Sequence, residues 1–153
     1  MRKTLGIMVG ATVLCTASIG LMATPGGAAP KTLKGAFTES FVTVPDGLAN
    51  LGNLSKATNS KAGPGASVGQ SYFVTGASSG TTKTVVYFAN GSITERSTVI
   101  LGPSSTGMPP ISGKGTCSDG TGVFAGVKCT YTFTGTYDEA KGTSTTTAKG
   151  TYK

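Results

Sequence analysis

The sequence predicts an all-β protein whose strands form a closed antiparallel barrel. Thr and Gly are frequent, and Thr and aromatic residues, which favour strands, alternate in several segments. Gly or Pro recurs between these segments at the spacing of hairpins. No segment keeps the period of about 3.6 residues that an amphipathic helix requires. The first and last strands are both regular enough to pair, which favours one closed barrel of six to eight strands over a sandwich. The chain of 153 residues is long enough for one such domain.

The clearest strands are those in which apolar and polar residues alternate. Lys34–Val44 is the first, and Lys128–Tyr137 is another. Ser92–Leu101 is the return strand of a hairpin, because Asn90-Gly91 before it is a strong hairpin signal. By contrast, Leu48–Ser67 is rich in Gly and Asn and reads as a long loop with a helical turn at its start. Further strands are expected at Val68–Gly76, Lys83–Phe88 and Thr143–Tyr152.

Residues 1–28 read as a secretory signal peptide. Arg2 and Lys3 precede an uncharged stretch that ends in small residues, and Gly26 with Ala28 predicts a mature chain that starts at Ala29. A membrane anchor is the alternative, but glycines interrupt the stretch and a helix breaker follows it. We therefore expect a short flexible N-terminus at 29–34, one barrel domain at 35–153, and a secreted or periplasmic location without stable membrane insertion.

The cysteines predict a disulfide. Cys15 belongs to the signal peptide, so Cys117 and Cys129 remain as an even pair in an exported chain. A free catalytic thiolate is the alternative, but the sequence contains no His that could act as its base.

Composition excludes several classes of function. The absence of His removes Ser-His-Asp triads and His-ligated metals. The carboxylates lack the spacing of a calcium-binding loop, so no metal is expected. No cofactor is expected either. The net charge is +7, but the lysines are scattered and Arg96 is the only Arg after the signal peptide. Nucleic-acid binding is therefore not expected.

Two carboxylates are candidate site residues. Glu39 lies between Phe37 and Phe41 on one face of its strand, and Glu95 shares a face with Ile93, Ser97, Val99 and Leu101. A carboxyl on an apolar face has a raised pKa and could donate a proton near neutral pH. The alternatives are that Glu39 is exposed near a barrel end and that Glu95 pairs with Arg96 or a nearby Lys. Tyr72, Tyr87 and Tyr131 read as packing residues.

From Val68 onward the order of signals resembles the allene oxide cyclase and dirigent superfamily. Val68-Gly69-Gln70, followed by Phe73 and Gly76, is similar to one strand of that family, and Phe88-Ala89-Asn90-Gly91-Ser92 is similar to one of its hairpins. The best match is Ile111-Ser112-Gly113 with the later Gly120-Thr121-Gly122-Val123-Phe124-Ala125-Gly126. Lys114–Asp119 departs from the family pattern as an insert, whose ends Cys117 and Cys129 would staple.

The resemblance implies an eight-stranded allene oxide cyclase-like barrel, in a secreted member of bacterial type. Enzymes of this superfamily hold an apolar intermediate in the barrel and guide cyclisation or radical coupling. None of their active-site residues aligns with this chain. The resemblance also admits a homo-oligomer assembled through the barrel sides.

Three functions follow from these observations. The first is a secreted small barrel that binds a small apolar molecule, without a requirement for catalysis. The second is a cyclase or isomerase of the allene oxide cyclase type, with Glu39 and Glu95 as its acid–base groups. The third is a structural or surface-interaction protein whose barrel is filled.

Overall fold

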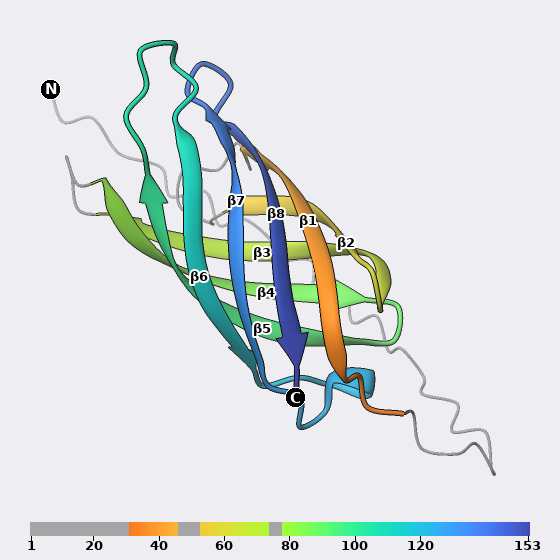
Figure 1. Ribbon diagram of the computed structural model, residues 1–153. Helices are drawn as coiled ribbons and strands as arrows, with labels where there is room; N and C mark the ends of the chain where they lie inside the picture. The colour runs from red at the N-terminus through yellow and green to blue at the C-terminus, as the bar shows by residue number, and fades with distance from the viewer. Residues whose placement is uncertain (1–30, 46–52, 74–77) are drawn as a thin grey trace, which may run out of the picture.

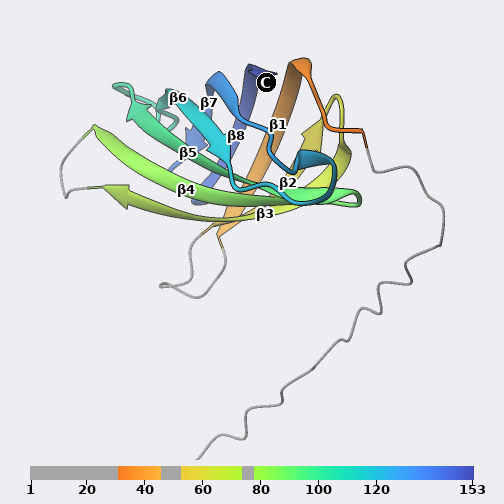
Figure 2. The ribbon, with the colours of Figure 1, turned by 90° about the horizontal axis from the view of Figure 1, so that it is seen from below.

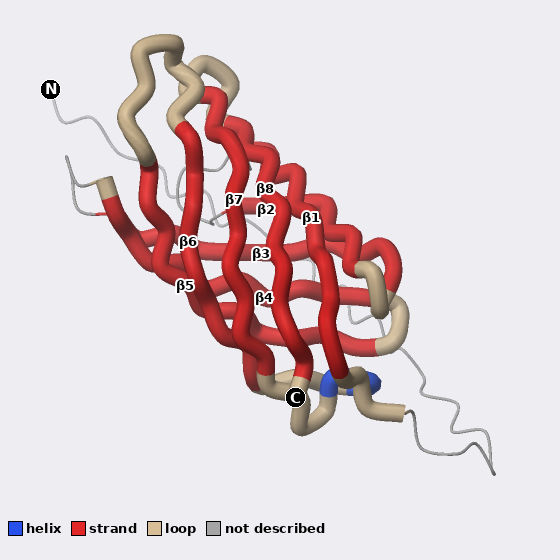
Figure 3. Tube along the Cα trace, viewed as in Figure 1, coloured by secondary structure: helices blue, strands red, loops and turns tan. Residues whose placement is uncertain are grey.

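The computed structural model describes residues 31–45, 53–73 and 78–153. Its strands form one closed antiparallel barrel, because each strand pairs with the next and β1 pairs with β8 (Figure 1, Figure 3). The predicted closed eight-stranded barrel is thus confirmed. The strands are β1 Gly35–Pro45, β2 Asn53–Asn59, β3 Gly63–Phe73, β4 Ser79–Phe88, β5 Gly91–Leu101, β6 Pro110–Ser118, β7 Cys129–Asp138 and β8 Thr143–Tyr152.

Part of the chain lies outside the described residues. The predicted signal peptide at 1–28, its cleavage site and the first two residues of the 29–34 segment belong to this part. In the described part, no helix is long and apolar enough to cross a membrane.

One end of the barrel is plugged, and we call it the closed end. The β6–β7 connection crosses it and contains the short 3-10 helix η1, Gly122–Phe124 (Figure 2). Phe124 and Val127 of this connection are fully buried. The Phe124 ring lies 5.3 Å from the Phe88 ring and 5.8 Å from the Tyr152 ring, and Phe37 stacks on Tyr152 at 4.1 Å. These rings form the hydrophobic core, so the core occupies one end of the barrel rather than its whole length.

Inward-facing glycines make room for inward-facing rings. Gly115 lies opposite Tyr131, and Gly150 lies opposite Phe37 in the strand register. A Cβ atom on Gly150 would lie 2.7 Å from the Phe37 ring, and one on Gly115 would overlap the Tyr131 ring. Each ring therefore packs over the backbone of a glycine. The missing side chain leaves the space that a bulky residue needs inside a narrow barrel.

Two predicted segments need correction. The expected loop Leu48–Ser67 instead contains all of β2 and the first part of β3, although its residues 48–52 lie outside the described part. The expected insert Lys114–Asp119 mostly continues β6. In both places the inward positions carry small residues such as Ala57, Ser67 and Gly115, so no apolar alternation marks the strand.

The outer face carries several exposed apolar side chains. Leu54 pairs with Val68, and Val68 pairs with Val85, across β2–β4. Tyr72 and Tyr87 also point outward and are 61% and 53% exposed, so the prediction that they pack inside is wrong. The strand alternation that places Val86 and Phe88 inside necessarily places Tyr87 outside.

Cys117 and Cys129 form the predicted disulfide. They are directly opposite at the closed end of β6 and β7, with Cα atoms 4.9 Å apart. Both cysteines are buried in the core cluster. The bridge therefore joins the two strands at the point where the β6–β7 connection leaves the barrel.

Replacing both cysteines by Ser should lower the free energy of unfolding by about 2–4 kcal/mol, because the bridge closes a short loop in the unfolded chain. Chemical denaturation of the double variant and of the wild type, with and without reductant, measures this. Reduced wild type should match the double variant. Equal stability of the double variant and the oxidised wild type would contradict the prediction.

Gly150→Ala should destabilise the barrel by about 1–3 kcal/mol, because the new methyl group would press on the Phe37 ring and the neighbouring backbone. Thr151→Ala is the matched control, since residue 151 is the next position of β8 and is exposed. Thermal unfolding should show a clear loss for residue 150 and a small effect for residue 151.

Candidate functional site

A cavity of about 380 Å³ occupies the part of the barrel that the core leaves empty. It extends from the core toward the end that carries the β5–β6 and β7–β8 connections, and we call this the open end (Figure 1). Ser71, Gly142 and Ser144 line it there, and Ser71 is exposed, so the cavity communicates with solvent.

The cavity wall has two chemical sides. Strands β2, β3 and β4 contribute mainly hydroxyl groups, whereas β5, β6 and β7 contribute mainly apolar and aromatic groups. Two pairs of hydroxyls satisfy each other, with Thr82 Oγ1 2.6 Å from Ser97 Oγ and Thr43 Oγ1 2.8 Å from Ser55 Oγ. Much of the wall can therefore contact an apolar molecule without leaving polar groups unpaired. The apolar and aromatic lining residues are Phe41, Val99, Leu101, Ile111, Tyr131, Phe133, Tyr137 and Ala148.

Glu39 and Glu95 meet at the level where the cavity ends and the core begins. Along β1, Glu39 lies between Phe37 of the core and Phe41 of the cavity wall. Along β5, Glu95 lies between Ile93 of the core and Ser97 of the wall. Glu39 is 1% exposed and Glu95 is 5% exposed, and Glu95 lines the cavity itself. The structure thus brings both predicted site residues together from two strands far apart in sequence.

The two carboxyls influence each other's protonation. Burial raises the pKa of Glu39 to about 7, while the neighbouring Glu95 carboxyl and Asn59 amide oppose this rise. The pKa of Glu95 is raised well above its ordinary value, first by burial and then by the charge of Glu39. Neither oxygen of Glu39 receives a hydrogen bond from a described protein donor. A protonated Glu95 carboxyl can donate this missing hydrogen bond to Glu39. The two carboxyls therefore titrate together and hold at least one proton near neutral pH.

Polar side chains from β2, β7 and β8 surround the pair. The Tyr131 hydroxyl lies close enough to Glu95 to lower the pKa of that carboxyl, and burial raises the pKa of Tyr131. The Asn59 side chain donates a hydrogen bond of 2.7 Å to the Tyr152 hydroxyl. Its Oδ1 accepts hydrogen bonds from the Lys61 and Ala62 backbone N–H groups, so the β2–β3 turn fixes the amide in place.

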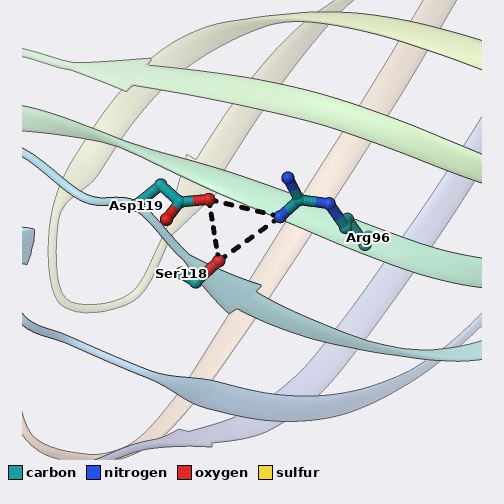
Figure 4. Close-up of polar contacts among 3 residues, drawn as sticks. All are labelled: Arg96, Ser118 and Asp119. Atoms are coloured by element: carbon teal, nitrogen blue, oxygen red, sulfur yellow. Dashed lines mark hydrogen bonds and ion pairs between the residues drawn. The ribbon is translucent and has the colours of Figure 1, made fainter.

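The charged neighbour of Glu95 in the sequence faces the outside of the barrel. Arg96 Nη1 donates to Ser118 Oγ and forms an ion pair with Asp119 Oδ2, each at 3.3 Å (Figure 4). Ser118 Oγ also donates to Asp119 Oδ2 at 3.0 Å. The alternative in which Arg96 neutralises Glu95 is therefore wrong, and so is the alternative in which Glu39 is exposed near a barrel end.

Sequence reasoning missed Asn59 and Tyr152 as neighbours of the carboxyl pair. Asn59 was expected in a loop, but it is an inward residue of β2 directly opposite Glu39. Tyr152 was placed in a strand without a role in the site. In the described residues, no group of three or more side chains of the metal-binding types gathers.

No known family model matches the chain. Neither a curated protein nor a solved structure matches it at a significant level. The likeness to the allene oxide cyclase and dirigent superfamily therefore stays a prediction from the motifs.

Glu39→Gln should reduce the pH dependence of stability, and the part that remains should come from Glu95, whose pKa burial still raises. The folded pKa of Glu39, about 7, lies above the unfolded value of 4.5, so the folded state binds more protons between these values and loses stability as pH rises. The shift corresponds to about 3 kcal/mol. Urea unfolding from about pH 4.5 to about pH 8 should show falling stability in the wild type and a flatter profile in the variant.

Glu139→Gln is the matched control, because Glu139 is exposed in the β7–β8 turn and should leave the profile unchanged. Asp119 and Asp138 act in the opposite direction, but only below their unfolded pKa of 3.8, which lies outside this pH range. A stability that rises with pH through the window from 4.5 to 7 would contradict the assignment.

Proposed function

We propose that the protein binds a small, largely apolar molecule inside the barrel. The observation that carries this proposal is the cavity of about 380 Å³, which has the size of a small-molecule site and reaches solvent at the open end. Apolar and aromatic side chains line one side of it, and the carboxyl pair lies at its floor. A cavity of this size favours the binding function over a filled barrel that acts only through its surface.

The proposed location is extracytoplasmic. The Cys117–Cys129 disulfide supports an oxidising compartment, in which such bonds form and persist. The predicted signal peptide at 1–28 is consistent with it, and Edman sequencing of secreted protein should then begin at Ala29.

A second candidate is an enzyme of the cyclase or isomerase type. The specific observation in its favour is the pair of carboxyls that retains a proton beside an apolar cavity, because a neutral carboxylic acid can protonate a bound substrate. A ligand that is cyclised or isomerised keeps its mass but changes its chromatographic retention. Incubation of each retained ligand with wild type and with Glu39→Gln protein distinguishes turnover from simple binding.

Thr84→Phe should abolish binding of apolar molecules. Thr84 lines the cavity opposite Glu95 and Gly69, so a ring at this position would fill the space that a ligand needs. Native mass spectrometry of protein purified from its source identifies a retained ligand, and displacement of an apolar fluorescent dye measures binding. Lys83→Phe is the matched control, because it adds the same ring at the next position of β4, where the side chain is exposed. Dye binding that Thr84→Phe leaves unchanged would contradict the proposal.

A further inference from the structure

The described residues that line the lumen include carboxyl groups and no cation to balance them. The ionisable groups that bear on the pair are Glu39 on β1, Glu95 on β5, Tyr131 on β7 and Tyr152 on β8. Strands β2, β3, β4 and β6 contribute amide, hydroxyl, sulfur and apolar groups to the lumen. Among the described residues, no Lys or Arg lines the cavity. A negative charge on the pair therefore has no counterion within the barrel wall.

Apart from a proton shared with Glu95, Glu39 has no hydrogen-bond donor among the described residues. Both of its oxygens are buried, and neither accepts a hydrogen bond from any other described group. Its neighbour Asn59 directs Nδ2 to the Tyr152 hydroxyl. A buried carboxyl in this position is costly unless a donor or a positive charge approaches from elsewhere. The cavity is the open side of the pair, and Glu95 faces it.

The aromatic lining suits a cation. Phe41 is the next inward residue after Glu39 on β1, and Tyr131 of β7 lies near Glu95. Phe133 is the next inward residue after Tyr131 on β7 and also lines the cavity. The face of an aromatic ring attracts a cation, and the attraction grows when water is excluded. Aromatic rings beside carboxyl groups, in a cavity with one apolar side, suit a molecule that carries an ammonium group on an apolar skeleton.

We propose that the ligand of this cavity is an apolar amine, whose protonated amino group lies against Glu95 and whose apolar body contacts the wall formed by β5, β6 and β7. This inference rests on the proposed binding function and narrows its ligand to one chemical class. A primary or secondary ammonium group supplies both the positive charge and the N–H donors that the floor lacks. The +7 charge of the chain belongs to outward-facing or terminal Lys and Arg, so the lumen differs in sign from the exterior.

Binding of an ammonium group should release a proton. Below the pKa of Glu39 both carboxyls of the free pair are protonated, and a bound ammonium charge favours ionisation of Glu39. The Glu39 proton is therefore released, while the Glu95 proton stays shared between the two carboxyls. The balance is one protonated amine and one protonated pair giving one complex and one proton in solution. Affinity for an amine should therefore increase as pH rises through the range in which Glu39 titrates. A neutral ligand that accepts a hydrogen bond from the pair would show the opposite dependence.

Phenethylamine and phenethyl alcohol are suitable probes, since they share one skeleton and differ in the charged group. Isothermal titration calorimetry should show the amine binding at least about tenfold more tightly than the alcohol at about pH 8, with a smaller difference at about pH 5. Titrations in buffers of different ionisation enthalpy should show proton release on amine binding only. These measurements use the wild-type protein, so they do not depend on the folding of any variant.

Glu95→Gln should remove the preference for the amine, because the group that faces the ammonium becomes neutral. Asp119→Asn is the matched control: it removes one carboxylate at the closed end, outside the cavity, and should preserve the preference. Circular dichroism verifies that both variants are folded.

The outcomes separate the two proposals. Equal affinity for amine and alcohol, or an amine preference that survives Glu95→Gln, would overturn the amine inference while the cavity remained a binding site. Failure of both probes and of the apolar dye to bind would overturn the binding function and the amine inference with it. If the alcohol bound more tightly than the amine at low pH, the cavity would be a site for neutral molecules that accept a hydrogen bond, and the amine inference would be wrong.

Discussion

Closure of the barrel through the pairing of β1 with β8 is the constraint on which the rest of the structure depends. Once the sheet closes, every second residue of each strand must point into one narrow lumen. The chain meets this constraint unevenly. Rings from β1, β4 and β8, together with Phe124, fill the closed end, while Ser, Thr and Gly at the corresponding positions of β2, β3 and β4 leave space toward the open end. The same closure carries Glu39 and Glu95 inside, because each lies between two inward-facing residues.

The carboxyl pair lies at the boundary between these two regions, and its chemistry follows from that place. Deeper in the core a charge would be excluded entirely, and nearer the open end water would solvate it. At the boundary, burial raises the pKa of both groups while the cavity remains accessible to Glu95. The groups around them assist: Asn59 is fixed by the β2–β3 turn, and Tyr131 fits inside because Gly115 lies opposite it. The protonation state of the site is thus a consequence of how the barrel is filled.

The sequence was sufficient where inward residues are large and outward residues are polar. That pattern predicted β1, β7 and the position of Glu39 and Glu95 on apolar strand faces. The Asn90-Gly91 turn predicted β5, and the even cysteine pair predicted the disulfide. The pattern failed at β2 and at the start of β3, where the inward residues Ala57, Asn59 and Ser67 are small or polar and the outward residues include Leu54 and Val68. There the usual contrast between faces is absent, because these strands present small or polar residues to both the cavity and the adjoining core. The meeting of Glu39 with Glu95 could not be predicted either, since it depends on the diameter and register of the closed barrel.

The presence of two carboxyls at one level of the lumen requires an explanation beyond packing. A Gln at position 39 has nearly the same shape as Glu and would carry its own N–H donors toward the Glu95 carboxyl, so it would satisfy the barrel interior at a lower desolvation cost. Two buried carboxyls instead cost stability as the pH rises from the unfolded pKa of 4.5 toward their raised folded pKa values. Packing alone therefore gives no reason for two acids at this level of the lumen. What two acids provide, and an amide does not, is a group that exchanges a proton and becomes negative beside an apolar cavity, and both properties act on a bound molecule rather than on the fold.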